Sequence, residues 1–305
     1  MTEEPESRVV LITGCSSGFG LRIAAHLSTG LHHVVASMRD LGKKDYLLRE
    51  IELRRGKVDL VALDVTDPAT IKDAIAKIKS RYGRLDVLIN NAGCGIGGFF
   101  EDLTPEEIRA QMETNFFGVQ NVIREALPLM RAQGRGLIIN MSSISGLNGL
   151  PCFGAYNASK WALEGFSESL FYELLPFGIK VCLIEPGVYK TKIFYENRQY
   201  ASRFFDQDSP YYAFSQMFQK RTNDHIKADT KNPDEIAFLV EKIMIEDSPS
   251  FRNIPDSRSR ILYALRRFLP FRLFSWIAAK LIYSSVTLPI ASGSHQADQR
   301  SSPNH

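Results

Sequence analysis

Short, β-branched apolar runs alternate with longer segments of helical periodicity between residues 8 and 185. Runs of this kind are typical of parallel strands that are buried on both faces of a sheet. Strict alternation of strand and helix favours a doubly wound parallel sheet, which binds its ligands at the carboxyl ends of the strands. The sequence therefore predicts a single Rossmann-like α/β domain with strands at 8–12, 33–38, 58–65, 85–90, 136–143 and 180–185.

A glycine-rich turn connects the first predicted strand to the first helix. Thr13 to Gly20 reads TGCSSGFG and runs directly into the helical segment LRIAAHLSTG. Glycines let the backbone of such a turn approach a pyrophosphate, while the helix N-terminus offers free N–H groups and a partial positive charge. The spacing is G-x-x-x-G-x-G rather than the more common G-x-G-x-x-G, and a glycine turn without a ligand is the alternative.

The residues after the second predicted strand bear on the choice of dinucleotide. An acidic residue there would hold the ribose 2′-hydroxyl of NAD, whereas a basic residue suits the 2′-phosphate of NADP. The sequence has Met38 followed by Arg39, which favours NADP(H) over NAD(H). Alternatively, Arg39 is a solvated loop charge paired with Asp40. After the third strand, Asp64 can accept from an adenine amino group or cap the following helix.

Three side chains that can act on a carbonyl group lie between Ser143 and Lys160. Tyr156 and Lys160 are four residues apart in a helical segment, so their side chains lie on the same face, one turn apart. An ammonium beside a phenol favours the phenolate and brings its pKa toward the working range. The Ser143 hydroxyl, at the end of a predicted strand, can stabilise charge on a substrate oxygen. An exposed helical face is the alternative for the Tyr-x-x-x-Lys pair.

Composition excludes several other kinds of protein. With 44% apolar and 23% charged residues the chain has the composition of a globular protein, and a net charge of +3 does not predict a nucleic-acid partner. The acidic start MTEEPESR lacks the apolar core of a secretory signal. No metal-ligand or disulfide spacing joins the cysteines, which predicts reduced thiols in the cytoplasm and no metal site; they are Cys15, Cys94, Cys152 and Cys182.

Taken together, these residues resemble the short-chain dehydrogenase/reductase family. The resemblance rests on TGCSSGFG at 13–20, NNAG at 90–93, Asn115, Ser143, YNASK at 156–160 and the Pro-Gly turn at 186–187. It spans about residues 8–192, and the runs SMRDLGKK and LEGFSESL are similar to the branch that contains 17β-hydroxysteroid and retinol dehydrogenases. The resemblance implies an NADP(H)-dependent alcohol dehydrogenase or carbonyl reductase that forms a homodimer or homotetramer.

The resemblance also implies roles for individual residues. Asn115, Ser143, Tyr156 and Lys160 would form a catalytic tetrad. Asn115 would bend its helix and hold a water that relays protons to Lys160; an ordinary polar helix position is its alternative. Lys160 would also bind the nicotinamide ribose hydroxyls, with Thr191 near the carboxamide. The other residues expected to contact the dinucleotide are Gly14, Ser17, Gly18, Phe19, Gly20, Arg39, Asp64, Val65, Asn91, Ala92, Gly93, Tyr156, Pro186, Gly187 and Val188.

Beyond Thr191 the resemblance weakens, so the chemistry carries over from the family while the substrate does not. Residues 192–230, where the family has its substrate lid, are rich in aromatic side chains. Apolar rings predict a cover for a lipophilic alcohol or ketone, such as a steroid, a retinoid or a long-chain lipid. Ordinary packing of a peripheral helix pair is the alternative. The rings belong to Phe194, Tyr195, Tyr200, Phe204, Phe205, Tyr211, Tyr212, Phe214 and Phe218.

The C-terminal part changes character. The sequence predicts a catalytic domain over 1–250, a basic amphipathic helical extension over 251–288 and a disordered tail over 289–305. No apolar span in the extension is long enough to cross a membrane. The segment 258–285 predicts peripheral membrane contact, with packing on the protein or a dimer face as the alternatives. Its basic residues are Arg258, Arg260, Arg266, Arg267, Arg272 and Lys280.

A competing hypothesis is a catalytically silent sensor or scaffold, which would bind the dinucleotide without turnover. Loss of one catalytic side chain would be the expected sign of such a protein. The intact set of Ser143, Tyr156 and Lys160 therefore argues against it.

Overall fold

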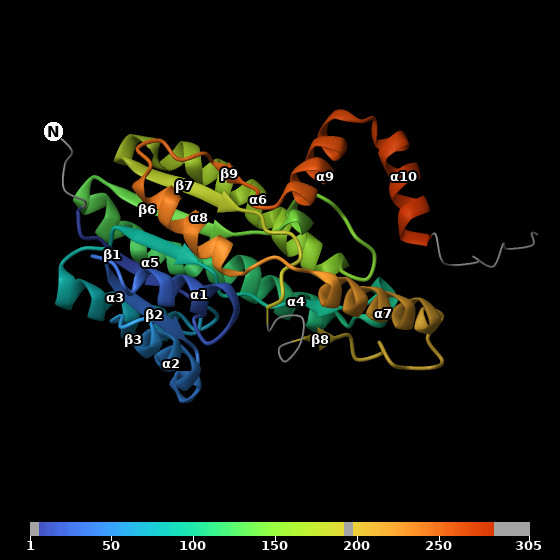
Figure 1. Cartoon of the computed structure of the whole chain (residues 1–305), viewed down its shortest axis with the longest axis horizontal. Helices are drawn as coiled ribbons and strands as arrows, with labels where there is room; N and C mark the ends of the chain where they lie inside the picture. Colours follow the sequence, from blue (N-terminus) through green and yellow to red (C-terminus); the bar gives the residue numbers. More distant parts are fainter. Residues whose placement is uncertain (1–5, 192–197, 284–305) are drawn as a thin grey trace, which may run out of the picture. The chain divides into compact units, whose positions relative to one another are not determined.

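Seven parallel strands form the central sheet, in the order β3-β2-β1-β4-β6-β7-β9 (Figure 1). The computed structural model describes residues 6–191 and 198–283, and it confirms the predicted doubly wound α/β fold. Six strands fall on the six predicted runs, whereas the two-residue edge strand β9 was not predicted. The strands are β1 (Val9–Ile12), β2 (His33–Met38), β3 (Asp59–Ala62), β4 (Val87–Asn90), β6 (Gly136–Met141), β7 (Ile179–Ile184) and β9 (Arg252–Asn253).

The strand order reverses between β1 and β4. The chain adds β2 and β3 on one side of β1, and it adds the later strands on the other side of β4. Leu11 of β1 is paired with Val35 of β2 and with Leu88 of β4. Ligands of doubly wound sheets bind in the crevice at such a reversal. The glycine turn follows β1, so it begins at this crevice.

Helices cover both faces of the sheet, because successive strand residues point to opposite faces. Val10 and Ile12 belong to the buried cluster shared with α1, α2 and α8, whereas Val9 and Leu11 belong to the cluster shared with α3, α5 and α6. Burial on both faces explains the uninterrupted apolar sequence of β1. These helices are α1 (Gly18–Leu27), α2 (Asp45–Leu53), α3 (Pro68–Tyr82), α5 (Gly118–Gln133), α6 (Gly154–Leu174) and α8 (Asp234–Ile245).

Capping residues fix the helices that lead toward the site. Asp67 accepts from the Ala69 N–H at the start of α3, and Thr104 forms a capping box with Glu107 at the start of α4 (Pro105–Met112). Helix α4 continues through a π-helical turn into α5, and such wide turns are frequent at functional sites. The π turn spans Glu113–Phe117, and the 3₁₀ turns span Leu41–Lys43, Phe100–Asp102, Ile144–Gly146 and Leu175–Phe177.

A second, two-stranded sheet pairs β5 (Ile96–Gly97) with β8 (Gln199–Tyr200), which are far apart in the sequence. Helix α7 (Tyr212–Ala228) joins this layer, since Phe218 packs against the buried cluster that contains Phe204. Because β5 follows β4 along the chain, this layer is attached to the carboxyl edge of the main sheet. Residues 192–197, the start of the predicted lid, lie outside the described residues.

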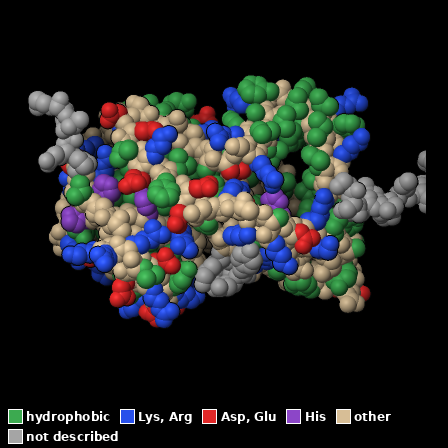
Figure 2. Space-filling model, viewed as in Figure 1, with side chains coloured by type: hydrophobic (Ala, Val, Ile, Leu, Met, Phe, Trp, Pro, Cys, Tyr) green, Lys and Arg blue, Asp and Glu red, His purple; other side chains and the backbone are tan. Residues whose placement is uncertain are grey.

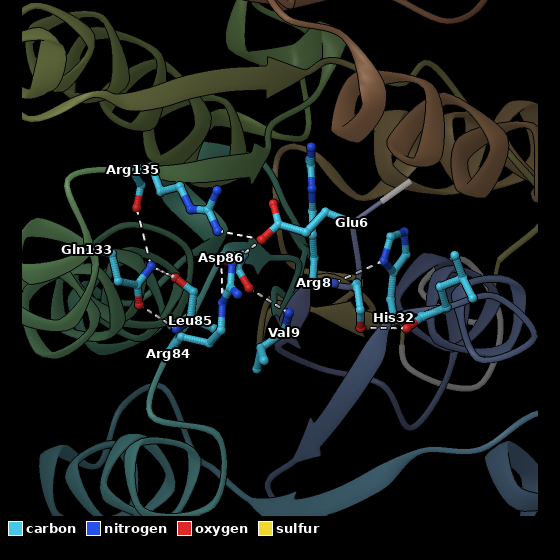
Figure 3. A network of polar contacts seen from close by, with 11 residues as sticks. Glu6, Arg8, Val9, His32, Arg84, Leu85, Asp86, Gln133 and Arg135 are labelled. Atoms are coloured by element: carbon cyan, nitrogen blue, oxygen red, sulfur yellow. Dashed lines mark hydrogen bonds and ion pairs between the residues drawn. The ribbon is translucent and has the colours of Figure 1, made fainter. Parts of the chain in front are cut away.

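A separate polar network holds the amino ends of the strands (Figure 3). Asp86 accepts from the Val9 N–H at 2.8 Å and pairs with Arg84 at 2.6 Å. Glu6 pairs with Arg84 at 3.2 Å and with Arg135 at 2.6 Å. We interpret this network as structural, because it satisfies backbone groups where β1 begins, at the edge opposite the glycine turn.

The chain divides into two compact units, residues 1–263 and residues 264–305. All elements described above belong to the first unit, which also contains the start of α9 (Ser257–Phe268). The second unit contains the end of α9 and helix α10 (Phe271–Tyr283). No helix in the described part of the chain has the length and apolar character needed to span a bilayer.

Candidate active site

The glycine turn after β1 packs closely against the end of β4. Asn91 donates from its side-chain nitrogen to the carbonyls of Thr13 and Gly14, at 2.8 and 3.1 Å. A Cβ on Gly20 would lie 2.3 Å from that nitrogen and 2.5 Å from the Gly14 oxygen, so the turn has no room for a side chain there. Gly14 itself has a φ of +73°, which other residues rarely adopt. The motifs at the ends of two strands therefore form one local structure.

Helix α1 begins within this turn. Gly18, its first residue, has a φ of +60°, and Ser17 forms no side-chain cap on the helix. The first turn of α1 also carries no acidic residue. Backbone N–H groups at a helix start have no partner within the helix and carry a partial positive charge. Together with the close-packed glycines, these donors fit the pyrophosphate of a dinucleotide. Phe19 packs edge-on against Tyr189, with ring centres 5.5 Å apart.

Arg39 and Asp64 lie just beyond the ends of β2 and β3. The Arg39 side chain is 77% exposed, and its Nε lies 3.9 Å from an Asp64 oxygen. Asp40, the alternative partner considered for Arg39, instead accepts from the Gly42 N–H at 2.8 Å. The other Asp64 oxygen accepts from the backbone and hydroxyl of Thr66, at 3.0 and 2.8 Å. Within the described part of the chain, Arg39 is therefore an exposed cation whose one ion-pair partner is distant.

Asn115 is completely buried in the π turn between α4 and α5. Its amide oxygen accepts from the Cys94 N–H, and its amide nitrogen donates to the Cys94 carbonyl, both at 2.9 Å. The same nitrogen donates to the Ser159 hydroxyl at 3.1 Å. Asn115 thus ties the segment after β4 to the helix that carries Tyr156. Both N–H groups of its amide are engaged, so a water in the expected relay could only donate to the Asn115 amide oxygen or contact the backbone of the turn.

Ser143 is buried directly after β6, and its hydroxyl has three neighbours. The hydroxyl accepts from the Ser145 N–H at 3.1 Å and donates to the Pro186 carbonyl at 3.4 Å. The third neighbour is the phenol of Tyr156. Ser143 and Tyr156 can therefore act on one substrate oxygen.

Tyr156 and Lys160 lie one turn apart on α6, with Lys160 buried and Tyr156 partly buried. The phenol ring also borders the segment after β4, since a Cβ on Gly95 would lie 3.6 Å from it. The Lys160 ammonium donates to the Met141 carbonyl at 2.7 Å and lies 5.9 Å from the centre of the Tyr156 ring. The lysine thus contacts the strand end that leads to Ser143 rather than the phenol oxygen.

Burial dominates the protonation of both side chains. It raises the pKa of Tyr156 above its usual value, and hydrogen bonding by Ser143 opposes that shift. It lowers the pKa of Lys160 to about 8, against favourable interactions with Cys94 and Glu164. The sequence led us to expect that Lys160 lowers the pKa of Tyr156. The structure does not show this effect, because the ammonium is directed at Met141.

A buried charge cluster behind Lys160 was not predicted. Glu164 lies one turn beyond Lys160 on α6, and Arg252 of β9 pairs with Glu164 and, at 3.2 Å, with Glu185. Burial raises the pKa of Glu185 to about 8, and repulsion by Glu164 adds to the shift. The four-residue spacing between Lys160 and Glu164 is visible in the sequence. The sequence gives no sign that Arg252 belongs to this cluster, because Arg252 is distant from Glu164 along the chain and reaches α6 only in the folded structure.

The loop after β7 lies between Ser143 and the glycine turn. The Pro186 carbonyl accepts from the Ile144 N–H at 3.0 Å, in addition to the Ser143 hydroxyl. Thr191 is buried at the other end of the loop. A Cβ on Gly18 would lie 3.8 Å from the Thr191 Cβ, so this loop and the start of α1 face each other.

The other residues predicted to contact the dinucleotide also lie just after strands of the main sheet. The Ala92 N–H donates to the Thr13 hydroxyl at 3.0 Å. A Cβ on Gly93 would lie 3.3 Å from the Asn115 amide oxygen. Val65 is buried after β3, and Val188 is partly exposed after Gly187. The predicted residues thus follow β1 to β4, β6 and β7 at their carboxyl ends.

Aromatic side chains of the predicted lid pack against one another and against Phe99. Tyr211 stacks on Phe99 with ring centres 4.7 Å apart, and Phe218 approaches the same ring edge-on at 5.7 Å. Phe204 is fully buried with its ring centre 4.1 Å from that of Tyr200. Ring packing, the alternative to a substrate cover, therefore accounts for part of this aromatic content. The predicted lid aromatics that lie outside the described residues are Phe194 and Tyr195.

Comparison with known proteins covers most of the chain. The family model described as short chain dehydrogenase matches residues 8–201. The chain is 39% identical over 280 residues to a 3-ketodihydrosphingosine reductase of Bacteroides thetaiotaomicron, and the match covers 92% of this chain and 99% of the relative. It is 35% identical to retinol dehydrogenase 8 of Bos taurus, over 86% of each chain. It is 32% identical to 17-beta-hydroxysteroid dehydrogenase type 1 of Homo sapiens, over 85% of this chain and 80% of the relative.

Solved structures share the fold. A short-chain dehydrogenase from Streptomyces avermitilis has a TM-score of 0.74 at 31% identity and covers 92% of this chain and 97% of its own. A metagenomic short-chain oxidoreductase in complex with NADP has a TM-score of 0.64 at 29% identity, over 82% and 97%. A short-chain dehydrogenase/reductase from Burkholderia phymatum in complex with NAD has a TM-score of 0.75 at 23% identity, over 86% and 93%. The last likeness concerns the fold alone.

Proposed function

Because the chain belongs to the short-chain dehydrogenase/reductase family, we propose that it is an NADP(H)-dependent oxidoreductase that interconverts an alcohol and a carbonyl group of a lipophilic substrate. The observation that carries this proposal is the grouping of Ser143, Tyr156 and Lys160 behind a glycine turn that fits a dinucleotide. The dinucleotide, when bound, would donate or accept the hydride.

The side chains of the site bind the substrate oxygen and transfer the proton. The Ser143 O–H donates a hydrogen bond to the substrate oxygen and stabilises the charge that develops there. Tyr156 donates its phenolic proton to the same oxygen in the reductive direction and takes it back in the oxidative one. Since burial raises the Tyr156 pKa, the phenol is protonated at neutral pH, which suits the donor role.

Lys160 supports this transfer from the next turn of α6. Its ammonium would leave the Met141 carbonyl for the nicotinamide ribose hydroxyls, where it also favours the phenolate form of Tyr156. Glu164 favours the charged form of Lys160 against the effect of burial. Asn115 would hold the start of α5 and the segment after β4 in place, so that Tyr156 keeps its position.

The preference for NADP(H) rests on Arg39. Its guanidinium is exposed after β2, where the 2′-phosphate of a bound dinucleotide would lie, and its ion pair with Asp64 is long. An exposed pair at that distance contributes at most about 1 kcal/mol, so Arg39 can leave it for a phosphate at little cost.

The proposed substrate class rests on the relatives and on the lid. A 3-ketodihydrosphingosine reductase, a retinol dehydrogenase and a 17-beta-hydroxysteroid dehydrogenase are by name enzymes of lipophilic substrates. The aromatic layer around Phe99 and α7 would add an apolar wall beyond the reacting carbon. We propose a long-chain, retinoid or steroid ketone or alcohol, acted on by an assembly of two or four copies.

Peripheral membrane contact extends the same proposal. From Ala264 to Tyr283 the chain carries no acidic residue, while Phe268, Phe271 and Trp276 are exposed. Figure 2 shows hydrophobic side chains gathered over the C-terminal helices, with Lys and Arg side chains at their margins. A cationic, aromatic surface of this kind suits the interface of an anionic bilayer, in which a lipophilic substrate is also dissolved.

A panel of carbonyl compounds tests the proposed function. The purified protein is mixed with NADPH or NADH and with a 3-keto sphingoid base, retinal or a 17-ketosteroid, and nicotinamide absorbance is followed. We expect turnover of at least one lipophilic ketone or aldehyde, with NADPH preferred. Tight NADPH binding without turnover of any compound or of the matching alcohols would favour the silent sensor instead.

A further inference from the structure

The peptide unit between Pro186 and Gly187 links Ser143 to Asp256, the residue before α9. At its carbonyl end, Pro186 accepts from the Ser143 hydroxyl at 3.4 Å and from the Ile144 N–H at 3.0 Å. At its N–H end, Gly187 donates to a carboxylate oxygen of Asp256 at 3.0 Å. Because a peptide unit is planar and rigid, holding its N–H also fixes the direction of its carbonyl. Asp256 is thus connected to Ser143 through a single peptide plane.

Burial, a hydrogen bond and a nearby ammonium fix the position of the Asp256 carboxylate. It is 8% exposed and lies immediately before α9. The carboxylate oxygen that does not bind Gly187 accepts from the Ser259 N–H at 3.0 Å and lies 3.7 Å from the Lys231 ammonium. Burial alone would raise the pKa of Asp256, but hydrogen bonds from Ser259, the charge of Lys231 and the Gly187 amide outweigh burial and lower it. The carboxylate therefore stays charged near neutral pH.

The contact is too close to be an accident of a loose loop. A Cβ on Gly187 would lie 2.4 Å from the Ser259 hydroxyl and 2.7 Å from an Asp256 oxygen. The backbone of the Pro-Gly turn is thus pressed directly onto the start of α9. A charged acceptor on the N–H polarises the peptide and makes the Pro186 carbonyl a stronger acceptor for the Ile144 N–H, which fixes the backbone next to Ser143. The single hydroxyl hydrogen of Ser143 would then turn from Pro186 to the substrate oxygen when substrate binds.

We propose that Asp256 is a positioning residue for Ser143, which it orients through the Pro186–Gly187 peptide. The inference rests on the proposed function, since it concerns the hydroxyl that would hold the substrate oxygen. Asp256 lies beyond residues 8–201, the part of the chain matched by the family model. The residues that lead into α9 within the first unit would therefore support the position of Ser143.

A double-mutant cycle tests the inference. Asp256→Ala is combined with Ser143→Ala, and hydride transfer is measured in single turnovers with excess enzyme and saturating dinucleotide, so that slow variants remain measurable. We expect Asp256→Ala to slow transfer about 10- to 100-fold in the presence of Ser143, because small misplacements of reacting groups have effects of that size. In the Ser143→Ala background the same change should slow transfer less than about twofold.

Two further variants separate positioning from folding. Lys231→Gln removes another partner of Asp256 but leaves its bond to Gly187, and should keep the rate within about threefold of wild type. Asp256→Asn keeps one carbonyl oxygen for the Gly187 N–H and should recover most of the rate that Asp256→Ala loses. If the alanine variant does not fold, Asp256→Ser, which retains one oxygen to cap α9 at the Ser259 N–H, replaces it in the cycle. The thermal midpoint and the dinucleotide dissociation constant are measured for every variant.

The outcomes are distinct. Equal losses from Asp256 substitution in both backgrounds, equal losses from Lys231→Gln, or a wild-type rate in Asp256→Ala would each overturn the positioning role. A Ser143→Ala variant as active as wild type would instead contradict the proposed function, which assigns the substrate oxygen to Ser143.

Discussion

The ionisable side chains of the site differ in burial, and burial decides what each of them can do. Lys160 is enclosed, so its pKa falls to about 8, and its ammonium donates to the Met141 carbonyl. Arg39 is largely exposed, and among the described residues its ion-pair partner Asp64 lies 3.9 Å away. An enclosed cation suits a fixed role in catalysis, whereas an exposed one suits recognition of a ligand that arrives from solvent.

Arg39→Ala should weaken NADPH binding more than NADH binding, because the 2′-phosphate is the part of NADPH that Arg39 would contact. A charge-assisted contact contributes about 1.5–3 kcal/mol, which corresponds to roughly a 10- to 100-fold rise in the NADPH dissociation constant. Titration of the protein with each dinucleotide measures the difference. Arg49→Ala, which removes an exposed arginine from α2, is the control and should change neither constant. Equal losses for both dinucleotides would show that Arg39 is only a loop charge.

Among the elements, the β1 turn, α1 and the end of β4 behave as one unit. The Asn91 amide bonds two carbonyls of the turn, and Gly20 packs on that amide. The dinucleotide site is thus built from two separate motifs, TGCSSGFG and NNAG, whose residues the fold brings into contact.

Gly20→Ala should damage this unit, since the new methyl group would force Asn91 away from the Thr13 and Gly14 carbonyls. Overpacking of this kind destabilises a protein by about 1–3 kcal/mol, and dinucleotide affinity should fall at least about tenfold with it. Urea unfolding and dinucleotide titration measure the two effects.

A second glycine provides the matched control. Gly165 lies on α6, where a Cβ would meet nothing within 4 Å, so Gly165→Ala should raise helix stability by about 0.5–1 kcal/mol. If Gly20→Ala were as stable and bound dinucleotide as tightly as Gly165→Ala, the close packing of the turn would have no functional importance.

The sequence predicts those elements whose signals are local. The six longer strands, the glycine turn and the placement of Tyr156 and Lys160 one turn apart on one helix follow from periodicity and spacing along the chain. The edge strand β9 is only two residues long, so it carries no periodicity. Arg252 and Asp256 acquire partners on α6 and in the Pro-Gly turn only after folding. The direction of the Lys160 ammonium likewise depends on the Met141 carbonyl, which lies on another element.

At the scale of the whole molecule, charge is distributed unevenly. The net charge is +3, yet residues 264–283 hold four basic residues and no acidic one: Arg266, Arg267, Arg272 and Lys280. Within this unit the Arg266 guanidinium lies 5.1 Å from the centre of the Phe271 ring, and the Lys280 ammonium lies 3.9 Å from that of Trp276. Cations paired with exposed rings are typical of segments that lie in the membrane interface.

The full-length protein should therefore sediment with vesicles that contain an anionic lipid, and salt should release it. Each basic residue near such a surface contributes about 1 kcal/mol of attraction. Replacing Arg266, Arg272 and Lys280 together by Gln should thus reduce binding strongly. Replacing three exposed lysines of α3 by Gln removes the same charge and should have little effect; they are Lys72, Lys77 and Lys79. Equal vesicle binding by the two variants, or binding that salt leaves unchanged, would exclude an interfacial role for this segment.

The central claim is that Tyr156 transfers the proton in an oxidoreductase reaction, and one substitution tests it. Tyr156→Phe removes the phenolic oxygen and leaves the ring that packs beside Gly95. Tyr172→Phe, which removes the hydroxyl of an exposed tyrosine on the same helix, is the control. With a substrate from the carbonyl panel, we expect Tyr156→Phe to lose at least about 1000-fold in turnover while its NADPH dissociation constant stays within about twofold of wild type. Tyr172→Phe should match wild type in both measurements. Turnover by Tyr156→Phe within a few-fold of wild type would contradict the assignment.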